Sequence, residues 1–148
     1  MAAGRIHLKI VTPFRMLYDD NVDMVVLRGT EGDMGVMPGH ESRAAILGYG
    51  PLRIINGGSE GGRIAIMGGF AEISSSEVTV VSDVAEWPEE IDRLRAEAAK
   101  LRAEQRLQQK DNDVDLQRAE LSLRRALVRM EVSSYPIIRT GKSPGQGK

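Results

Sequence analysis

Residues 84–101 read VAEWPEEIDRLRAEAAKL and mark the point where the chain changes from one kind of structure to another. Thirteen of the sixteen glycines precede Pro88, and residues 71–140 contain none. Because each interior glycine destabilises a helix by about 1 kcal/mol, helices are unfavourable before Pro88 and favourable after it. Pro88 itself suits a first helical turn, where its missing N–H would have had no partner. The sequence therefore predicts an α+β fold, with strands first and helices second.

The half that precedes Pro88 has the pattern of many short strands. Residues Arg5–Thr12 alternate between apolar and polar side chains, which is typical of a strand with one buried face. Further short apolar runs occur at Val22–Leu27, Met34–Met37, Ala44–Leu47, Leu52–Ile55, Arg63–Met67, Phe70–Ile73 and Val78–Val81. Turn-forming stretches such as Gly29–Gly32 and Asn56–Gly58 separate them. Short strands at this spacing predict a sandwich or a barrel over residues 1–87.

The half that follows has the pattern of two helices. The first is predicted from Pro88 to about Gln109, and the second lies between the polar turn Lys110–Asp113 and Pro136. Their apolar stripes consist of Ile91, Leu94, Ala98 and Leu101 on the first helix, and of Leu116, Ala119, Leu123, Ala126, Leu127 and Met130 on the second. The stripes predict an antiparallel hairpin that depends on a further surface from the β half or from a partner. Residues 134–148 are expected to form a flexible tail.

Composition and charge exclude several classes of protein. The 148 residues carry 20 basic and 21 acidic side chains, a net charge of −1, which argues against a nucleic-acid-binding protein. The chain has no cysteine, so disulfides, thiolate metal sites and cysteine nucleophiles are excluded, and two histidines do not suffice for a zinc site. No apolar run reaches ~18 residues, so no membrane-spanning helix is expected. The charge is unevenly divided, with a net −4 over residues 1–87 and +3 over residues 88–148.

His40, Glu41 and Ser42 are the candidate catalytic group of the β half. A histidine beside a carboxylate and a hydroxyl can act as a general base. Neighbours within one loop seldom converge on one reacting atom, however, and no oxyanion site is indicated. A role for His40 in shaping its loop by hydrogen bonds is therefore favoured over catalysis.

Arginines of the helical half form a second candidate site. Each predicted helix carries three charged residues on one face, Asp92, Arg95 and Arg102 on the first and Arg118, Arg125 and Arg129 on the second. If the two faces adjoin, the guanidiniums converge into a site for phosphate or for carboxylates of a partner. The alternative is a solvated face whose arginines form weak salt bridges, each worth ~0–1 kcal/mol, with neighbouring glutamates. Helical periodicity alone leaves both interpretations open.

A series of motifs covers residues 5–132 in a distinctive order. Along the chain they are Val11-Thr12-Pro13, GTEGDMGVMPGH at Gly29–His40, Gly50-Pro51-Leu52, Gly68–Ile73, Val78-Thr79-Val80, Asp83–Glu86 and the segment Ile91-Asp92-x-x-Arg95-Ala96. Together they resemble the bacterial type of the epsilon subunit of F-type ATP synthase, the proton-translocating ATPase.

The resemblance implies a fold and a function. The fold is a β-sandwich of about ten short strands at residues 1–87, which anchors the subunit, and a regulatory two-helix hairpin at residues 88–133. Such a subunit has no catalytic residues and belongs to the rotor, or central stalk, where it couples proton-driven rotation to ATP synthesis. Its hairpin inhibits ATP hydrolysis when extended. The implied partners are the gamma subunit, the c-ring and, in the extended state, the catalytic alpha and beta subunits, on the cytoplasmic face of the cell membrane.

The resemblance also implies two sets of site residues. A regulatory ATP would bind the compact hairpin through Glu86, Ile91, Asp92, Arg95, Ala96, Arg102, Arg125 and Arg129. The loop that contacts other subunits would include Glu31, Gly32, Met37, Pro38, Gly39 and His40. No metal and no required cofactor are implied.

Two functions from other classes remain as alternatives. A free-standing ATP-sensing module would use the same arginines without any ATP synthase partner. A small β-sandwich enzyme would use His40, Glu41 and Ser42, and would lose its activity on His40→Ala. Neither alternative accounts for the division of the chain into two differently built halves.

Overall fold

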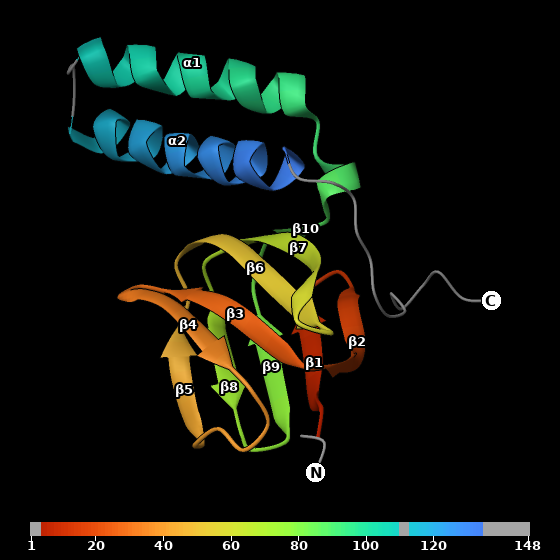
Figure 1. Cartoon of the computed structure of the whole chain (residues 1–148). Helices are drawn as coiled ribbons and strands as arrows, with labels where there is room; N and C mark the ends of the chain where they lie inside the picture. Colours follow the sequence, from red (N-terminus) through yellow and green to blue (C-terminus); the bar gives the residue numbers. More distant parts are fainter. Residues whose placement is uncertain (1–3, 110–112, 135–148) are drawn as a thin grey trace.

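The computed structural model describes residues 4–109 and 113–134 as a β-sandwich with a helical hairpin beyond one end of it (Figure 1). The tail predicted at residues 134–148 lies outside the described residues, apart from Ser134. Ten strands form two five-stranded sheets, so the predicted sandwich of about ten strands is confirmed and the barrel is excluded.

Each sheet contains five strands from distant parts of the chain. Sheet A has the order β2 (Met16–Val22), β1 (Ile6–Val11), β9 (Glu77–Val81), β8 (Phe70–Ile73) and β5 (Arg43–Ile46). Sheet B has the order β10 (Ala85–Glu86), β7 (Ser59–Met67), β6 (Tyr49–Asn56), β3 (Met24–Gly29) and β4 (Gly32–Val36). Neighbouring strands are antiparallel except for β1 and β9, which are parallel.

The inner faces of the two sheets share one hydrophobic core. Alternate residues of β1, among them Leu8 and Ile10, are completely buried in it. Trp87 follows β10 and packs against Tyr18, with 6.1 Å between the ring centroids. Burial raises the pKa of the Tyr18 hydroxyl to about 12. The start of the helical half is therefore anchored in the core of the sandwich.

Strand β2 was not predicted, because its sequence contains Asp19, Asp20 and Asn21, which resemble a turn. The strand lies at the edge of sheet A, where polar side chains face solvent and find partners on β1. His7, for example, bonds to the side chains of Asn21 and Asp19. An edge strand can carry such residues at little cost, which is why its composition is misleading.

The helical half begins differently from the prediction. Pro88 opens a short 3₁₀ turn, η1 (Pro88–Glu90), and the chain is extended at Ile91, with φ −89° and ψ 124°. Helix α1 (Arg93–Gln109) starts only afterwards, because Asp92 caps it by accepting a hydrogen bond from the backbone N–H of Arg95 at 3.1 Å. The predicted single helix from Pro88 is therefore wrong in its first five residues.

Helices α1 and α2 (Asp113–Ser133) pack on each other through alanine rather than leucine. Ala96 and Ala103 are buried on α1, and Ala119 and Ala126 are buried on α2. Residues seven apart occupy the same helical face, and methyl side chains allow close approach of the two backbones. Contrary to the predicted stripe, Leu94 and Leu101 point outward and are 78% and 60% exposed.

A second face of α2 packs on sheet B, over β6 and β7 (Figure 1). Val128 and Val132 are buried against Ala65 of β7, with Tyr49 and Ile91 at the margin of this cluster. The β half therefore supplies a surface on which the hairpin depends, one of the two possibilities predicted from the sequence. Within the described residues, neither helix is long and apolar enough to cross a membrane.

Candidate functional site

A cleft of about 420 Å³ lies where the linker from β10 meets the two helices. Its volume is within the range of small-molecule sites. The cleft is lined by Glu86, Glu90, Ile91, Asp92, Arg95, Ala96, Ala99, Arg102 and Arg129. Seven of the eight residues that the resemblance assigned to an ATP site are thus brought together. The eighth, Arg125, is exposed on α2 and is not among the lining residues.

Glu86 and Arg129 form the ion pair that joins the linker to α2 across the cleft. Nε of Arg129 donates to Oε1 of Glu86 at 2.7 Å, and Nη2 lies 3.4 Å from Oε2. Both side chains are about two-thirds or more buried, at 33% and 25% exposure. A two-contact pair that is partly desolvated is more ordered than a surface salt bridge, so Arg129 is held in position by its carboxylate partner.

Arg95 and Arg102 supply positive charge without an internal counterion. Neither forms an ion pair with any other residue in the described ranges 4–109 and 113–134. They lie seven positions apart on α1, so their Cα atoms are separated by about 10.5 Å along one face of the helix. Two exposed guanidiniums at this spacing are suited to an elongated anion with several phosphate or carboxylate groups.

Glu90 and Ala99 were not predicted as site residues. Glu90 accepts a hydrogen bond from the backbone N–H of Trp87 at 2.9 Å, the reciprocal contact of a capping box. Nη2 of Arg15 also donates to both carboxylate oxygens of Glu90, at 2.8 Å to Oε1 and 2.6 Å to Oε2. The glutamate three residues after Trp87 was a local signal for the cap. Ala99 lies between Arg95 and Arg102 on the same face of α1, so helical periodicity could have identified it.

The described lining residues offer guanidinium and carboxylate groups, but no hydroxyl or imidazole. Asp92 is occupied as the cap of α1, and Glu90 is occupied by Arg15 and Trp87. Such a lining can bind and orient an anion, whereas it contains no activated nucleophile. Within the described residues, no group of three or more acidic or histidine side chains is arranged to hold a metal ion.

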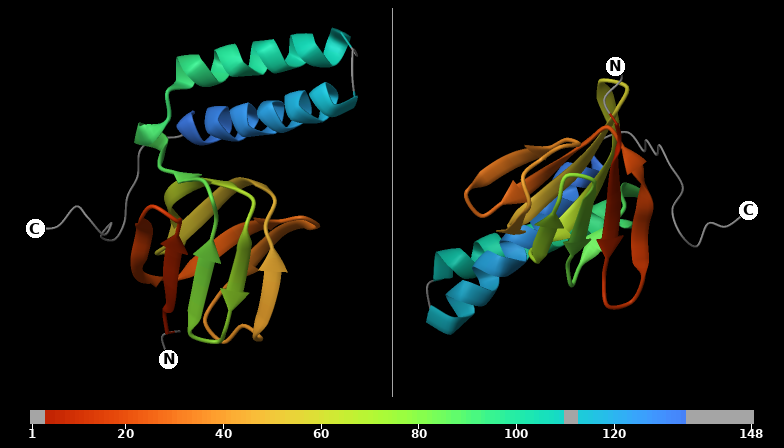
Figure 2. Two further views of the ribbon diagram at one scale, coloured as in Figure 1. Left: turned by 180° about the vertical axis from the view of Figure 1, so that it is seen from behind. Right: turned by 90° about the horizontal axis from the view of Figure 1, so that it is seen from below.

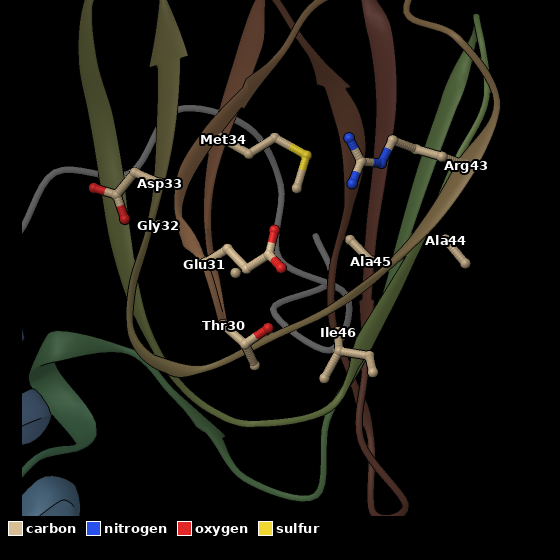
Figure 3. A pocket seen from close by; sticks show the side chains of 10 residues that line it. Thr30, Glu31, Gly32, Asp33, Met34, Arg43, Ala44, Ala45 and Ile46 are labelled. Atoms are coloured by element: carbon tan, nitrogen blue, oxygen red, sulfur yellow. The ribbon is translucent and has the colours of Figure 1, made fainter.

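The residues predicted as one subunit-contact loop lie at the two ends of strand β4. Glu31 lies in the β3–β4 turn and Gly32 begins β4, beside a pocket of about 370 Å³ between β4 and β5 (Figure 3). Figure 3 shows the side chains of Glu31 and Arg43 projecting into the space between these strands. The five residues of β4 span about 16 Å, so the two ends belong to separate surfaces.

Met37, Pro38, Gly39 and His40 follow β4 at its other end. The N–H of Gly39 donates to the carbonyl of Ser75 at 2.8 Å, which ties this loop to the β8–β9 turn. Gly39 has φ +87°, a conformation that favours glycine, and Met37 is 57% exposed. Nδ1 of His40 bonds to the backbone carbonyl of Glu41 at 2.7 Å. This nitrogen therefore stabilises the loop and is not bonded to the hydroxyl of Ser42, as a general base would be.

Comparison with known proteins identifies similarity along nearly the whole chain. Residues 5–88 match the family described as ATP synthase, delta/epsilon chain, beta-sandwich domain. Residues 89–134 match the family described as ATP synthase, delta/epsilon chain, long alpha-helix domain.

Individual relatives have similar lengths. The chain is 43% identical to the ATP synthase epsilon chain of Caldicellulosiruptor saccharolyticus, over 84% of this chain and 90% of that protein. It is also 43% identical to the ATP synthase epsilon chain of Halalkalibacterium halodurans, over 86% of this chain and 96% of that protein.

A solved structure shares the fold. The cryo-EM structure of Euglena gracilis mitochondrial ATP synthase, comprising OSCP, F1 and the c-ring, contains a chain that is 26% identical and superposes with a TM-score of 0.77. The match covers 88% of this chain and 82% of that chain.

Proposed function

The chain belongs to the delta/epsilon chain family of ATP synthase, and from this premise we propose that it is the epsilon subunit of the central stalk. It is part of a rotary ATP synthase, and it contacts the gamma subunit and the c-ring. Its sandwich attaches it to the rotor, so that rotation is coupled to ATP synthesis. The subunit itself carries out no catalysis, and it lies on the cytoplasmic face of the membrane.

The hairpin inhibits ATP hydrolysis when it leaves sheet B. The observation that supports this role is how the hairpin is held: an apolar cluster with three buried residues, Val128, Val132 and Ala65, and ion pairs such as Glu86–Arg129. A docking surface of this size can be exchanged for another one on a partner at little cost. In the extended state, the exposed Leu94 and Leu101 and the arginines of the hairpin would contact the gamma, alpha and beta subunits.

ATP binds the cleft between the linker and the two helices and stabilises the compact hairpin. Arg95 and Arg102 hold its phosphates, because they are the cleft's guanidiniums without a described counterion. Arg129 joins them on binding, and Glu86 then becomes free to accept a hydrogen bond from the base. Because lining residues come from both helices and from the linker, only the compact form presents them together. ATP at a hundred times its Kd would favour that form by about 2.7 kcal/mol if the extended form does not bind it.

Two measurements on the full-length chain and the assembled enzyme test these roles. In titration calorimetry, the parent chain should bind ATP, and Arg102→Ala should weaken binding at least ~10-fold through loss of a charge-assisted contact. Arg106→Ala is the matched control, since Arg106 is also exposed on α1 but does not line the cleft. Equal affinities of the two variants, or no binding by the parent, would reject the ATP site.

The inhibitory role is tested separately in the assembled ATP synthase. A chain that ends at Trp87 keeps all ten strands and lacks the hairpin. The enzyme that contains it should hydrolyse ATP faster than the enzyme with the full chain. An unchanged rate of hydrolysis would show that this hairpin does not inhibit, whether or not it binds ATP.

A further inference from the structure

A second cavity lies between α2 and the end of strand β3 in sheet B. Its volume of about 680 Å³ exceeds that of the cleft and is within the range of small-molecule sites. Figure 2 shows the helices extending past the sandwich on the side where β3 ends. The cavity is called the flank cavity below, and the lining residues that carry the argument are Arg28, Tyr49, Arg124, Leu127, Val128 and Glu131.

The flank cavity and the cleft lie on different sides of α2. Successive residues of a helix are rotated by about 100°, so Arg124 and Glu131 differ by about 20° around the axis, whereas Arg129 is about 140° from Arg124. Val128 and Val132, which pack on sheet B, lie between these two directions. The docked face of α2 therefore has the cleft on one side and the flank cavity on the other, with no described lining residue in common.

The wall that the sandwich contributes carries a fixed positive charge. Nε of Arg28 donates to Oδ1 of Asp33 at 2.9 Å. A Cβ atom at Gly50 would collide with the side chain of Arg28, so this side chain lies directly against the backbone of β6. Nη1 of Arg28 is 4.0 Å from Oε2 of Glu131, which is beyond hydrogen-bond length, and this nitrogen can therefore donate to a ligand.

The wall that α2 contributes combines a second arginine with apolar side chains. Nη2 of Arg124 is 3.5 Å from Oε1 of Glu120 and both side chains are mostly exposed, so this pair is weak and Arg124 can bind another anion instead. Leu127 is 44% exposed, and Val128 beside it is buried. Tyr49 adds the apolar surface of its ring from β6. The flank cavity thus has apolar surface and one guanidinium from each wall.

We propose that the flank cavity binds a monovalent organic anion with an apolar body, that is, an aliphatic or aromatic carboxylate. Arg28 and Arg124 contribute two positive charges and Glu131 contributes one negative charge, so the lining has a net charge of +1, which a monoanion neutralises. The carboxylate accepts hydrogen bonds from the guanidiniums, and the chain or ring lies on Leu127 and Val128.

This ligand contacts the sandwich and α2 together, so it binds the docked hairpin and stabilises it. The site is a property of the chain alone and does not depend on the proposed stalk function or on the ATP site. It would give the hairpin a second ligand that favours the compact state, on the opposite flank of the Val128 and Val132 contact.

Titration calorimetry on the full-length chain tests the site, with octanoate as the aliphatic probe and phenylacetate as the aromatic one. Acetate lacks the apolar body, and octanol lacks the charge. The parent should bind at least one of the two probes, and should bind acetate and octanol at least ~10-fold more weakly. The tighter probe identifies the preferred body. No binding of either probe, or equal binding of octanol, would overturn the proposal.

One pair of variants tests the role of Arg124. Arg124→Gln should weaken binding of the tighter probe at least ~10-fold, because a charge-assisted contact is lost. Arg118→Gln is the matched control, since it removes the same charge from an exposed position of α2 outside the cavity, and it should change the affinity less than ~3-fold. Equal losses would show that the probe responds to the overall charge of α2, and the proposal would fail.

Glu131→Gln gives a test that misfolding cannot imitate, because affinity should increase. It raises the net charge of the lining from +1 to +2 and removes the carboxylate beside Arg28, so the probe should bind ~3-fold tighter or more. Glu104→Gln, on α1 and outside the cavity, is its control and should bind as the parent does. Unchanged or weaker binding by Glu131→Gln would contradict the proposal.

Arg102→Ala separates the flank cavity from the cleft. This variant should lose affinity for ATP and keep the parent's affinity for the probe, because Arg102 lines only the cleft. If it weakens probe binding as much as Arg124→Gln does, the carboxylate occupies the cleft and the inference is overturned. Failure of the ATP site or of the stalk function would leave probe binding by the parent unchanged, so the separate failures are distinguishable.

Discussion

Removing two methyl groups from Val132 should release the hairpin from the sandwich without unfolding either part. Val132 is completely buried, and among the described residues it clusters with Val128 and Ala65, with Tyr49 and Ile91 at the margin. Val132→Ala removes two buried carbon groups, worth about 0.8 kcal/mol each, and leaves a small cavity. The compact state should therefore lose about 2 kcal/mol relative to the extended state, which lowers the docking equilibrium constant by about 30-fold.

Energy transfer between two dyes measures this equilibrium directly. The chain has no cysteine, so Glu41→Cys on the sandwich and Gln108→Cys on α1 give two unique labelling positions, both exposed. In the compact state the dyes report one distance. In Val132→Ala, a second population at a longer distance should grow, and the enzyme assembled with this variant should hydrolyse ATP more slowly.

Leu127→Ala is the matched control, because Leu127 lies on the same helix but is 44% exposed and outside the cluster. It should leave the distance distribution of the parent nearly unchanged. If Val132→Ala gives the parent's distribution as well, the cluster does not hold the hairpin and the reasoning is refuted. If Val132→Ala abolishes the cooperative unfolding of the sandwich, the sandwich depends on the docked hairpin for its own stability, and the reasoning also fails.

Two further predictions concern stability. The pKa of His7 is raised by side-chain hydrogen bonds to Asn21 and Asp19, so its contribution to stability is present below about pH 6.5 and is lost as the pH rises through the raised pKa. The difference in Tm between the parent and His7→Gln should therefore shrink from pH 5.5 to pH 8, and a constant difference would contradict this. Ala103→Leu should overfill the helix contact and destabilise the hairpin by about 1–3 kcal/mol, seen as an earlier loss of helical circular dichroism, whereas Leu101→Ala should change it little. Equal melting of the two variants would show that alanine is not needed there.

The division of the chain into a strand-forming half and a helix-forming half could be predicted from local composition. The short apolar runs before Pro88 correspond to eight of the ten strands, and the glycine-free, periodic stretch after it corresponds to the two helices. The edge strand β2 was not predicted, because its Asp19-Asp20-Asn21 segment is polar and its pairing with β1 is not encoded locally. The 3₁₀ turn at Pro88 was not predicted either. Asp92 caps the start of α1, so the turn at Pro88 and the helix are separate elements rather than one continuous helix.

The candidate site was predictable only in part. Helical spacing placed Arg95 and Arg102 on one face of α1, and the structure has them lining one cleft. Arg125 and Arg129 are four residues apart on α2, so periodicity treats them alike. Of the two, Arg129 lines the cleft, where Glu86 holds it, because it lies one helical turn, about 6 Å, farther along α2 toward the linker. Where α2 lies along the linker depends on Val128 and Val132 packing on Ala65, a contact between distant segments.

By itself, the sequence determined that strands precede Pro88 and helices follow it, and which charged residues share a helical face, since both follow from local composition and spacing. Tertiary structure alone decided that alanines rather than leucines join the two helices, and which arginine enters the cleft. It also decided that Met16, Val11, Val81, Phe70 and Ile46 form one row across sheet A. These features depend on strand register and on the docking of the hairpin, which are free energies summed over contacts far apart in the chain.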